Sequence, residues 1–201
     1  MKRIALLSIA VLVAASCTSC TDNPYEKLPK VPAFAVTSTD VKNGEAMPVA
    51  QMSGVFGAGG KDDSPQLAWS GFPKETKSFV VTLYDPDAPT ASGFWHWAVV
   101  DIPANVTMLA TGAGAPEGKG LPKGAYMLPN DARNVRFLGA APPVGHGKHC
   151  YYFVVHAVDV ETLGVPKDAT PAFLGFNLFT HTLARATLVT WAERKEAAKK
   201  P

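Results

Sequence analysis

Apolar residues dominate three segments of this chain, and each has the length and composition of a β-strand. Residues 78–84 are β-branched and aromatic, and they run into the sequence DPDAP at residues 85–89. Residues 94–102 form a second segment of this kind, closed by Pro103. Residues 150–160 are almost continuously apolar, which is typical of a strand buried on both faces. The pattern therefore predicts three long strands, the last of them near the centre of a sheet.

Shorter apolar runs and two long loops complete the middle of the chain. Residues 67–69 and 134–138 predict two further, shorter strands. Residues 112–123 and 141–147 are rich in glycine and proline. Loops of this length, carried on a rigid scaffold, often hold functional residues.

The C-terminal part changes to a broken helical pattern. Thr170 followed by Pro171 is typical of a helix start, with an N-cap residue and proline at the first helical position. Residues 187–191 fit either a returning strand or a continuation of the helix. Strands first and helices last, without β–α–β alternation, predict a mainly β fold: an antiparallel β-sandwich with small C-terminal helices.

The N-terminus has the pattern of an export signal. A positive start is followed by an apolar stretch, residues 4–13, that is too short to span a bilayer. Small residues precede Cys17, and this order resembles the bacterial lipoprotein signal, in which that cysteine becomes the acylated N-terminus. We expect a signal peptide at 1–16, a lipidated tether at 17–32 and one domain at 33–201. The alternative is a plain secretory signal cut nearby, so the expected location is the outer side of the cell membrane or the exterior.

Composition and cysteine content narrow the function. The chain has 201 residues, of which 47% are hydrophobic, as expected for one domain with a single core. Its formal net charge of +2 is too small to indicate nucleic-acid binding. If Cys17 is acylated, Cys20 and Cys150 remain, and an oxidising compartment would allow them to pair. The sequence leaves that pairing open.

The first group of titratable residues is the DPDAP motif. If the chain stays extended after the strand, Asp85 and Asp87 lie on one side, because side chains alternate with a period of two. The alternative is a turn in which each aspartate caps a backbone N–H. The rigid turn also makes the Ala88–Pro89 bond a candidate for the cis isomer.

The second group lies in the sequence FWHW at residues 94–97. By alternation, His96 faces opposite to Trp95 and Trp97. One interpretation is a structural histidine whose ring bonds a backbone carbonyl. The other is a histidine oriented by a carboxylate, which raises the pKa of the imidazole and keeps a donor aimed at a bound anion.

The third group lies in the sequence PPVGHGKHCY at residues 142–151. Here a proline- and glycine-rich loop leads into the last of the three long strands. His149 and Tyr151 are two residues apart and therefore point to the same face. His146 lies between glycines at the loop tip, where we expect it to be exposed.

In this order, the three motifs closely resemble the phosphatidylethanolamine-binding proteins, a group that includes the Raf kinase inhibitor proteins, and in particular their bacterial branch. The resemblance covers residues 33–193 and extends to the segments 67–70, 130–133 and 181–184. One position departs from it. The family usually has a basic residue between the histidine and the tyrosine of the third motif, where this chain has Cys150.

The resemblance implies an antiparallel β-sandwich with a small anion pocket at one end. Such pockets hold phosphate-like or carboxylate-like groups, including phospholipid head groups, and need no cofactor. Bacterial relatives often pair, so a homodimer is one expected partner state. By alternation, Cys150 faces away from the pocket, which should survive the departure. The residues carried over to the binding site are Asp85, Asp87, His96, His149, Tyr151, Gly145 and Gly147.

Three functions remain open from the sequence. The first is a membrane-tethered module that binds a small anionic ligand, and the second is a protein-interaction or protease-inhibitor module. The third is a hydrolase that uses aspartate, histidine and tyrosine as acid and base, but Ser92 is the only serine near the second motif and no nucleophile elbow surrounds it. Asp85, His96 and His149 also have the ligand types of a zinc site. The resemblance points to anions and away from a metal, and we expect no enzyme activity.

Overall fold

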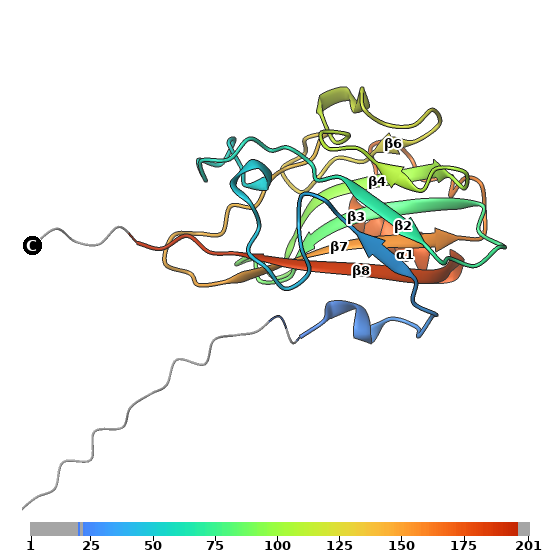
Figure 1. Cartoon of the computed structure of the whole chain (residues 1–201), viewed down its shortest axis with the longest axis horizontal. Helices are drawn as coiled ribbons and strands as arrows, with labels where there is room; N and C mark the ends of the chain where they lie inside the picture. Colours follow the sequence, from blue (N-terminus) through green and yellow to red (C-terminus); the bar gives the residue numbers. More distant parts are fainter. Residues whose placement is uncertain (1–19, 21, 197–201) are drawn as a thin grey trace, which may run out of the picture.

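The computed structural model describes Cys20 and residues 22–196, which form two antiparallel sheets and one α-helix (Figure 1). The predicted signal peptide, residues 1–16, and the predicted lipidation site Cys17 lie outside the described residues. No helix among the described residues is long and apolar enough to cross a membrane. The elements are η1 (Pro24–Lys27), β1 (Ala35–Thr37), η2 (Val49–Gln51), β2 (Leu67–Ser70), β3 (Ser78–Asp85), β4 (Phe94–Pro103), β5 (Met108–Leu109), η3 (Pro116–Gly118), β6 (Tyr126–Met127), β7 (His149–Val158), α1 (Pro171–His181) and β8 (Thr182–Ala192).

The larger sheet has five strands in the order β6-β4-β3-β7-β8, and the three long strands predicted from the sequence are its centre. β3 pairs antiparallel with β4 on one side and with β7 on the other. Every residue of β7 is buried, as its continuous apolar run predicts. This arrangement places the end of β3 beside the beginnings of β4 and β7, where the three polar motifs lie.

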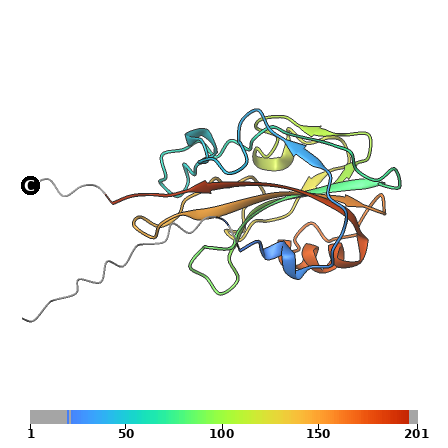
Figure 2. The same cartoon turned by 60° about the horizontal axis from the view of Figure 1, so that its bottom comes forward.

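A smaller sheet, in the order β1-β2-β5, packs on one face of the larger sheet, and the main core lies between them. Alternate residues of β3 show the division between the two faces. Val81 and Leu83 belong to the main core, whereas Val80 packs with Leu174 and Leu178 of α1 in a second apolar cluster. We call the face toward the smaller sheet the inner face and the face toward α1 the outer face. Figure 2 shows α1 and η1 together on the outer face.

The C-terminal region contains a helix and then a strand. Thr170 caps α1 as predicted, because its side chain accepts a hydrogen bond from the backbone N–H of Phe173. The residues 187–191, which fitted either a strand or a helix, lie in β8. The sequence predicted small C-terminal helices, and the described residues contain one α-helix, α1. The apolar residues that follow it form β8, which pairs with β7 and extends the sheet.

Two local predictions are wrong. Residues 134–138 do not form a strand, because the backbone N–H groups of Phe137 and Leu138 donate to two separate segments, at Gly114 and His96. The Ala88–Pro89 bond is trans, as are all peptide bonds of the described residues. The turn closes instead through the backbone N–H of Thr90, which donates to the carbonyl of Ala88 at 2.6 Å.

The segment before the domain is fastened to the outer face. A disulfide joins Cys20 to Cys150, a pairing that the sequence left open. The ring centroid of Tyr25 lies 6.2 Å from that of Tyr152, whose hydroxyl donates to the carbonyl of Asp22 at 3.3 Å. The part of the predicted tether from residue 22 onward therefore covers the sheet, with η1 as its one helical turn.

Candidate functional site

A small cavity of about 140 Å³ lies where β3 ends and where β4 and β7 begin. Its wall combines three aromatic or apolar loops with four polar side chains from the strand ends. The lining residues are Phe56, Asp85, Ala88, Pro89, Thr90, Phe94, His96, Ala141, Pro142, Pro143, His149 and Tyr151. The structure thus brings together four of the predicted site residues, one or two from each motif. We call this space the anion cavity.

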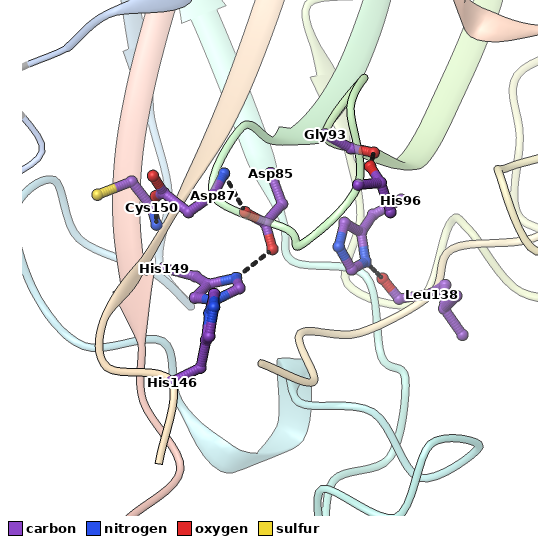
Figure 3. Close-up of polar contacts among 9 residues, drawn as sticks. Asp85, Asp87, Gly93, His96, Leu138, His146, His149 and Cys150 are labelled. Atoms are coloured by element: carbon purple, nitrogen blue, oxygen red, sulfur yellow. Dashed lines mark hydrogen bonds and ion pairs between the residues drawn. The ribbon is translucent and has the colours of Figure 1, made fainter. Parts of the chain in front are cut away.

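Asp85 and His149 form a buried pair at the base of the anion cavity (Figure 3). The distance from His149 Nδ1 to Asp85 Oδ2 is 2.8 Å, and the two side chains are 1% and 4% exposed. Because the carboxylate accepts, Nδ1 of His149 carries the proton that is shared with it. The pair therefore fixes the ring and leaves Nε2 as the atom that varies with protonation.

His146 was expected only at an exposed loop tip, and the structure adds a contact that the sequence did not indicate. Its ring is exposed, but its Nδ1 lies 2.7 Å from Nε2 of His149. With both rings neutral, His146 donates to His149, and a chain of hydrogen bonds runs from the surface through His149 to Asp85. The only feature of the sequence that could have indicated this contact is the spacing of the two histidines, which are three residues apart.

His96 reaches the anion cavity because β4 contains an irregularity at this point. Leu83 pairs with Trp97 and Tyr84 pairs with Trp95, so His96 is an extra residue in β4. Trp97 consequently lies in the main core of the inner face, while Trp95 packs on Tyr84 of the outer face, with ring centroids 4.3 Å apart. The prediction that both tryptophans face away from His96 is therefore wrong for Trp97, because the bulge breaks strict alternation.

The contacts of His96 match the structural interpretation, and yet the ring also lines the anion cavity. Its Nδ1 lies 3.0 Å from the carbonyl of Leu138, which can only accept, so Nδ1 is protonated and Nε2 is the free nitrogen. Burial lowers the pKa of His96 below its usual value, although the charge of Asp85 acts in the opposite direction. The histidine oriented by a carboxylate is therefore His149, and the lowered pKa of His96 favours its neutral form.

Tyr151 presents a hydroxyl group without a partner to the same cavity. The residue is fully buried, and its hydroxyl lies near the carboxylate of Asp85 and the backbone of Ala141 without the geometry of a hydrogen bond to either. Burial and the nearby charge of Asp85 raise its pKa well above the ordinary value, so the hydroxyl keeps its proton. A buried O–H without a partner costs free energy, and a bound acceptor would remove that cost.

Asp87 does not line the anion cavity, although the sequence placed it there. Its carboxylate accepts from the backbone N–H of Cys150 at 2.7 Å, and its own N–H donates to Oδ1 of Asp85 at 2.9 Å. The contact between Asp85 and the N–H of Asp87 is the turn contact of the alternative interpretation, whereas the carboxylate of Asp87 binds an N–H of another strand. Asp87 therefore holds the turn after β3 against the start of β7 and positions Asp85 (Figure 3).

Gly145 and Gly147 also lie outside the lining. Both have positive φ angles, +76° and +92°, which glycine adopts without strain. The N–H of Gly145 donates to the carbonyl of Arg194 and so turns away from the anion cavity. These glycines shape the loop that carries His146, and the wall is made instead by the segment Ala141–Pro143.

Asp62, which no sequence motif indicated, supports this wall from behind. Its buried carboxylate accepts three backbone N–H groups, from Gly54 at 2.9 Å, Val55 at 3.1 Å and Gly139 at 2.8 Å. Burial alone would raise its pKa, but the amide donors more than offset this effect and hold the pKa below the usual value. Asp62 thereby fixes Gly139, two residues before the wall segment.

The cavity can receive a small anion if protons are available. Tyr151 supplies one O–H, and each histidine can supply an N–H from Nε2 only when its ring is protonated. Asp85 repels an anion except insofar as it pairs with His149. Ser92 is not part of the lining, and no cluster of three or more metal-ligating side chains occurs among the described residues.

Comparison with known sequences identifies the relatives of this chain. The family model described as phosphatidylethanolamine-binding protein matches residues 37–192. The chain is 45% identical over 163 residues to the UPF0098 protein YbcL of Escherichia coli, covering 81% of this chain and 89% of YbcL. It is 43% identical over 151 residues to YbhB of the same organism, covering 75% of this chain and 94% of YbhB.

Solved structures show the same fold. The crystal structure of E. coli YbcL superposes with a TM-score of 0.78 at 44% identity, covering 80% of this chain and 98% of that one. The structure of the homologue CT736 from Chlamydia trachomatis gives a TM-score of 0.67 at 28% identity, covering 81% and 98%. The chain therefore belongs to the phosphatidylethanolamine-binding protein family, in its bacterial YbcL branch.

Proposed function

We propose that this protein is a binding protein for a small phosphate- or carboxylate-containing anion, such as a phospholipid head group, and that the anion cavity is its site. The observation that carries the proposal is the buried hydroxyl of Tyr151, which has no hydrogen-bond partner among the described residues and belongs to a side chain that lines a cavity shared with two histidines. An anion would accept this hydrogen bond and bring the negative charge that favours protonated imidazole.

The geometry predicts that proton uptake accompanies binding. His96 already uses Nδ1 on Leu138, and His149 uses Nδ1 on Asp85, so each ring can donate to the anion only through a protonated Nε2. His149 must also exchange its contact with His146 for one with the ligand. Affinity should therefore fall as the pH rises, because a neutral imidazole loses this donor.

We further propose that the protein acts outside the cytoplasm, held at the membrane by an acylated Cys17. The disulfide between Cys20 and Cys150 supports export, since such bonds persist in oxidising compartments. It also engages Cys20, which leaves Cys17 as the cysteine for acylation. A position near the membrane would bring phospholipid head groups within reach of the anion cavity.

The proposal is for binding without turnover. The nucleophile that a covalent mechanism needs is not supplied by Ser92, which is outside the lining. His149 could serve as a base, but its Nε2 is held by His146 and its Nδ1 by Asp85. We therefore expect no hydrolysis of phosphoesters, and we assign Asp85 and His149 to holding the ligand.

The test is a calorimetric titration of the full chain with inorganic phosphate and with phosphoethanolamine, at pH 6 and pH 8. Tyr151→Phe removes only the hydroxyl and should weaken binding by about tenfold or more, as expected for a hydrogen bond to a charged group. Tyr152→Phe, on the opposite face of β7, is the matched control and should bind as the wild type does.

The stability of Tyr151→Phe separates a binding role from a structural one. Because the hydroxyl has no hydrogen-bond partner among the described residues, this variant should be as stable as the wild type or more stable, while it binds worse. Absence of any heat or melting-temperature shift with either ligand would contradict the proposal. Phosphoester turnover that disappears in a folded His149→Ala variant would favour the hydrolase instead.

A further inference from the structure

A second and larger cavity, of about 260 Å³, lies on the outer face of the five-stranded sheet. Its floor is the sheet, one wall is α1, and the other wall is the segment that follows Cys20, the arrangement seen in Figure 2. We call it the outer cavity. Its lining residues are Pro24, Tyr25, Leu28, Pro29, Val31, Thr82, Tyr84, Trp95, His156, Pro171, Gly175, Leu178, Phe179, Thr182 and Arg185. None of them lines the anion cavity.

Three buried polar atoms of the lining residues have no hydrogen-bond partner within the part of the chain that the structure describes. They are the hydroxyl oxygens of Tyr25 and Thr82 and Nε of Arg185. Thr82 is only 2% exposed, and its hydroxyl lies near that of Tyr25 without the geometry of a hydrogen bond. A bond between the two would still leave one O–H hydrogen unused. Buried donors left free in this way indicate a place for an acceptor.

Arg185 is the only cation in the lining, and no acidic side chain lines the cavity. Among the described residues, its guanidinium forms no ion pair, and its nearest aromatic contact is the ring of Tyr25, at 5.7 Å. His156 adds no charge at neutral pH, because burial lowers its pKa to about 3. The lining residues therefore supply one positive charge and two hydroxyl groups without a partner, those of Tyr25 and Thr82, and the rest of the wall is mostly apolar.

The mouth of the outer cavity is open and apolar. Gly175 lies in the interior of α1, where glycine is less favourable than alanine, and a Cβ atom placed there would meet no atom within 4 Å. Phe179 and Leu28 at the rim are 62% and 39% exposed, and Phe176 of the same helix is 77% exposed. An apolar ligand can therefore enter beside Gly175 without displacing a side chain.

We propose that the outer cavity binds a small amphiphile with a single anionic head, namely a medium-chain acyl carboxylate. The carboxylate would lie against Arg185, Tyr25 and Thr82, and the chain would run along α1 toward Gly175. A doubly charged phosphate would be left with an uncompensated charge against one guanidinium. The volume lies below the roughly 300–1,000 Å³ of pockets for drug-sized ligands, so a ligand of about ten to fifteen non-hydrogen atoms is expected. This site does not depend on the function proposed for the anion cavity.

Calorimetric titration of the full, oxidised chain with sodium decanoate, below its micelle-forming concentration, tests the proposal. Decanoate should bind saturably, and an excess of inorganic phosphate should not compete. Gly175→Leu fills the mouth and should abolish binding, whereas Gly175→Ala leaves most of the space and should retain it. Arg185→Gln should weaken decanoate binding by about tenfold or more, because it removes a charged hydrogen-bond donor.

The charge of the head group provides a second test, which uses only the wild-type protein. Decylamine has the same chain and the opposite charge, and it should bind far more weakly than decanoate to the wild-type protein. Equal affinities for the two compounds would overturn the proposal. Unchanged decanoate binding in a Gly175→Leu variant with the wild-type melting temperature would overturn it as well. Loss of phosphate binding with decanoate binding intact would count against the anion cavity only.

Discussion

Replacement of Asp62 tests whether one buried carboxylate holds the wall of the anion cavity in place. The side chain is 7% exposed and accepts backbone N–H groups from two loops that are far apart in the sequence, at residues 54–55 and at Gly139. Asp62→Asn keeps the shape and tolerates the positive φ of +56°. It removes the charge and points an NH₂ group at one of the amide donors. Asp62→Ala removes all three hydrogen bonds.

The expected loss of stability follows from these contacts. A hydrogen bond to a charged group contributes about 1.5–3 kcal/mol net, and bonds that share one acceptor are not additive. We expect about 2–3 kcal/mol for Asp62→Asn and about 3–5 kcal/mol for Asp62→Ala, each a large part of the roughly 5–15 kcal/mol typical of a domain. The matched control is Asp63→Asn, because the carboxylate of Asp63 forms no hydrogen bond among the described residues.

The pH dependence of this loss has a definite sign. The pKa of Asp62 is lower in the folded protein than its ordinary value of 3.8, so its stabilisation is complete above that value and is lost as the pH falls through the folded pKa. Urea denaturation at pH 7, 5 and 3 should show a wild-type advantage over Asp62→Asn that shrinks only at pH 3. Equal stability of the Asp62→Asn and Asp63→Asn proteins at pH 7 would refute the reasoning.

Three further predictions concern the histidines and the disulfide. His146→Ala should leave the melting temperature nearly unchanged and tighten phosphate binding by about two- to tenfold, because phosphate no longer has to break the hydrogen bond between His146 and His149. Weaker binding of phosphate by this variant in calorimetry would contradict this prediction. His156 has a pKa of about 3 in the folded protein, so between this value and about 6.5 the unfolded chain binds a proton that the folded protein does not. Wild-type stability should therefore decline as the pH falls through this range. His156→Leu should show a weaker dependence of stability on pH when both proteins are unfolded with urea at the same pH values. The double variant Cys20→Ser, Cys150→Ser should lose about 2–4 kcal/mol of stability. Proteases should cut it within residues 22–31 before they cut the rest of the domain. Equal cleavage rates with and without the disulfide would show that other contacts suffice to hold this segment.

The fold was predictable because its strongest signals are local. The apolar segments that became β3, β4 and β7 owe their strand character to composition, and burial of both faces of β7 follows from its unbroken apolar run. The segment 134–138 has a similar composition, but it donates to two unrelated segments and forms no ladder. The apolar pattern of a segment indicates an extended backbone, and the segment becomes a strand only where another segment pairs with it in the folded protein.

The site was predictable only as far as alternation holds. His149 and Tyr151 share a face because β7 is regular, and both line the anion cavity. His96 reaches the cavity through an extra residue in β4, which no periodicity reveals. Asp62 could not be found at all, since its partners are backbone N–H groups, and every residue other than proline carries one.

The regularity of β7 also explains why the chain can have Cys150, where the resemblance led us to expect a basic residue, and keep the anion cavity. The residues at 149 and 151 face inward to the ligand site, whereas those at 150 and 152 face outward to the disulfide and to Tyr25. A change at position 150 therefore alters what covers the outer face and leaves the inner wall untouched. The N–H of Cys150 is bound by the carboxylate of Asp87, and a substitution at position 150 does not change this backbone group. A cysteine at this position can consequently fasten the N-terminal segment over the outer cavity without changing the side chains that line the anion cavity on the other face.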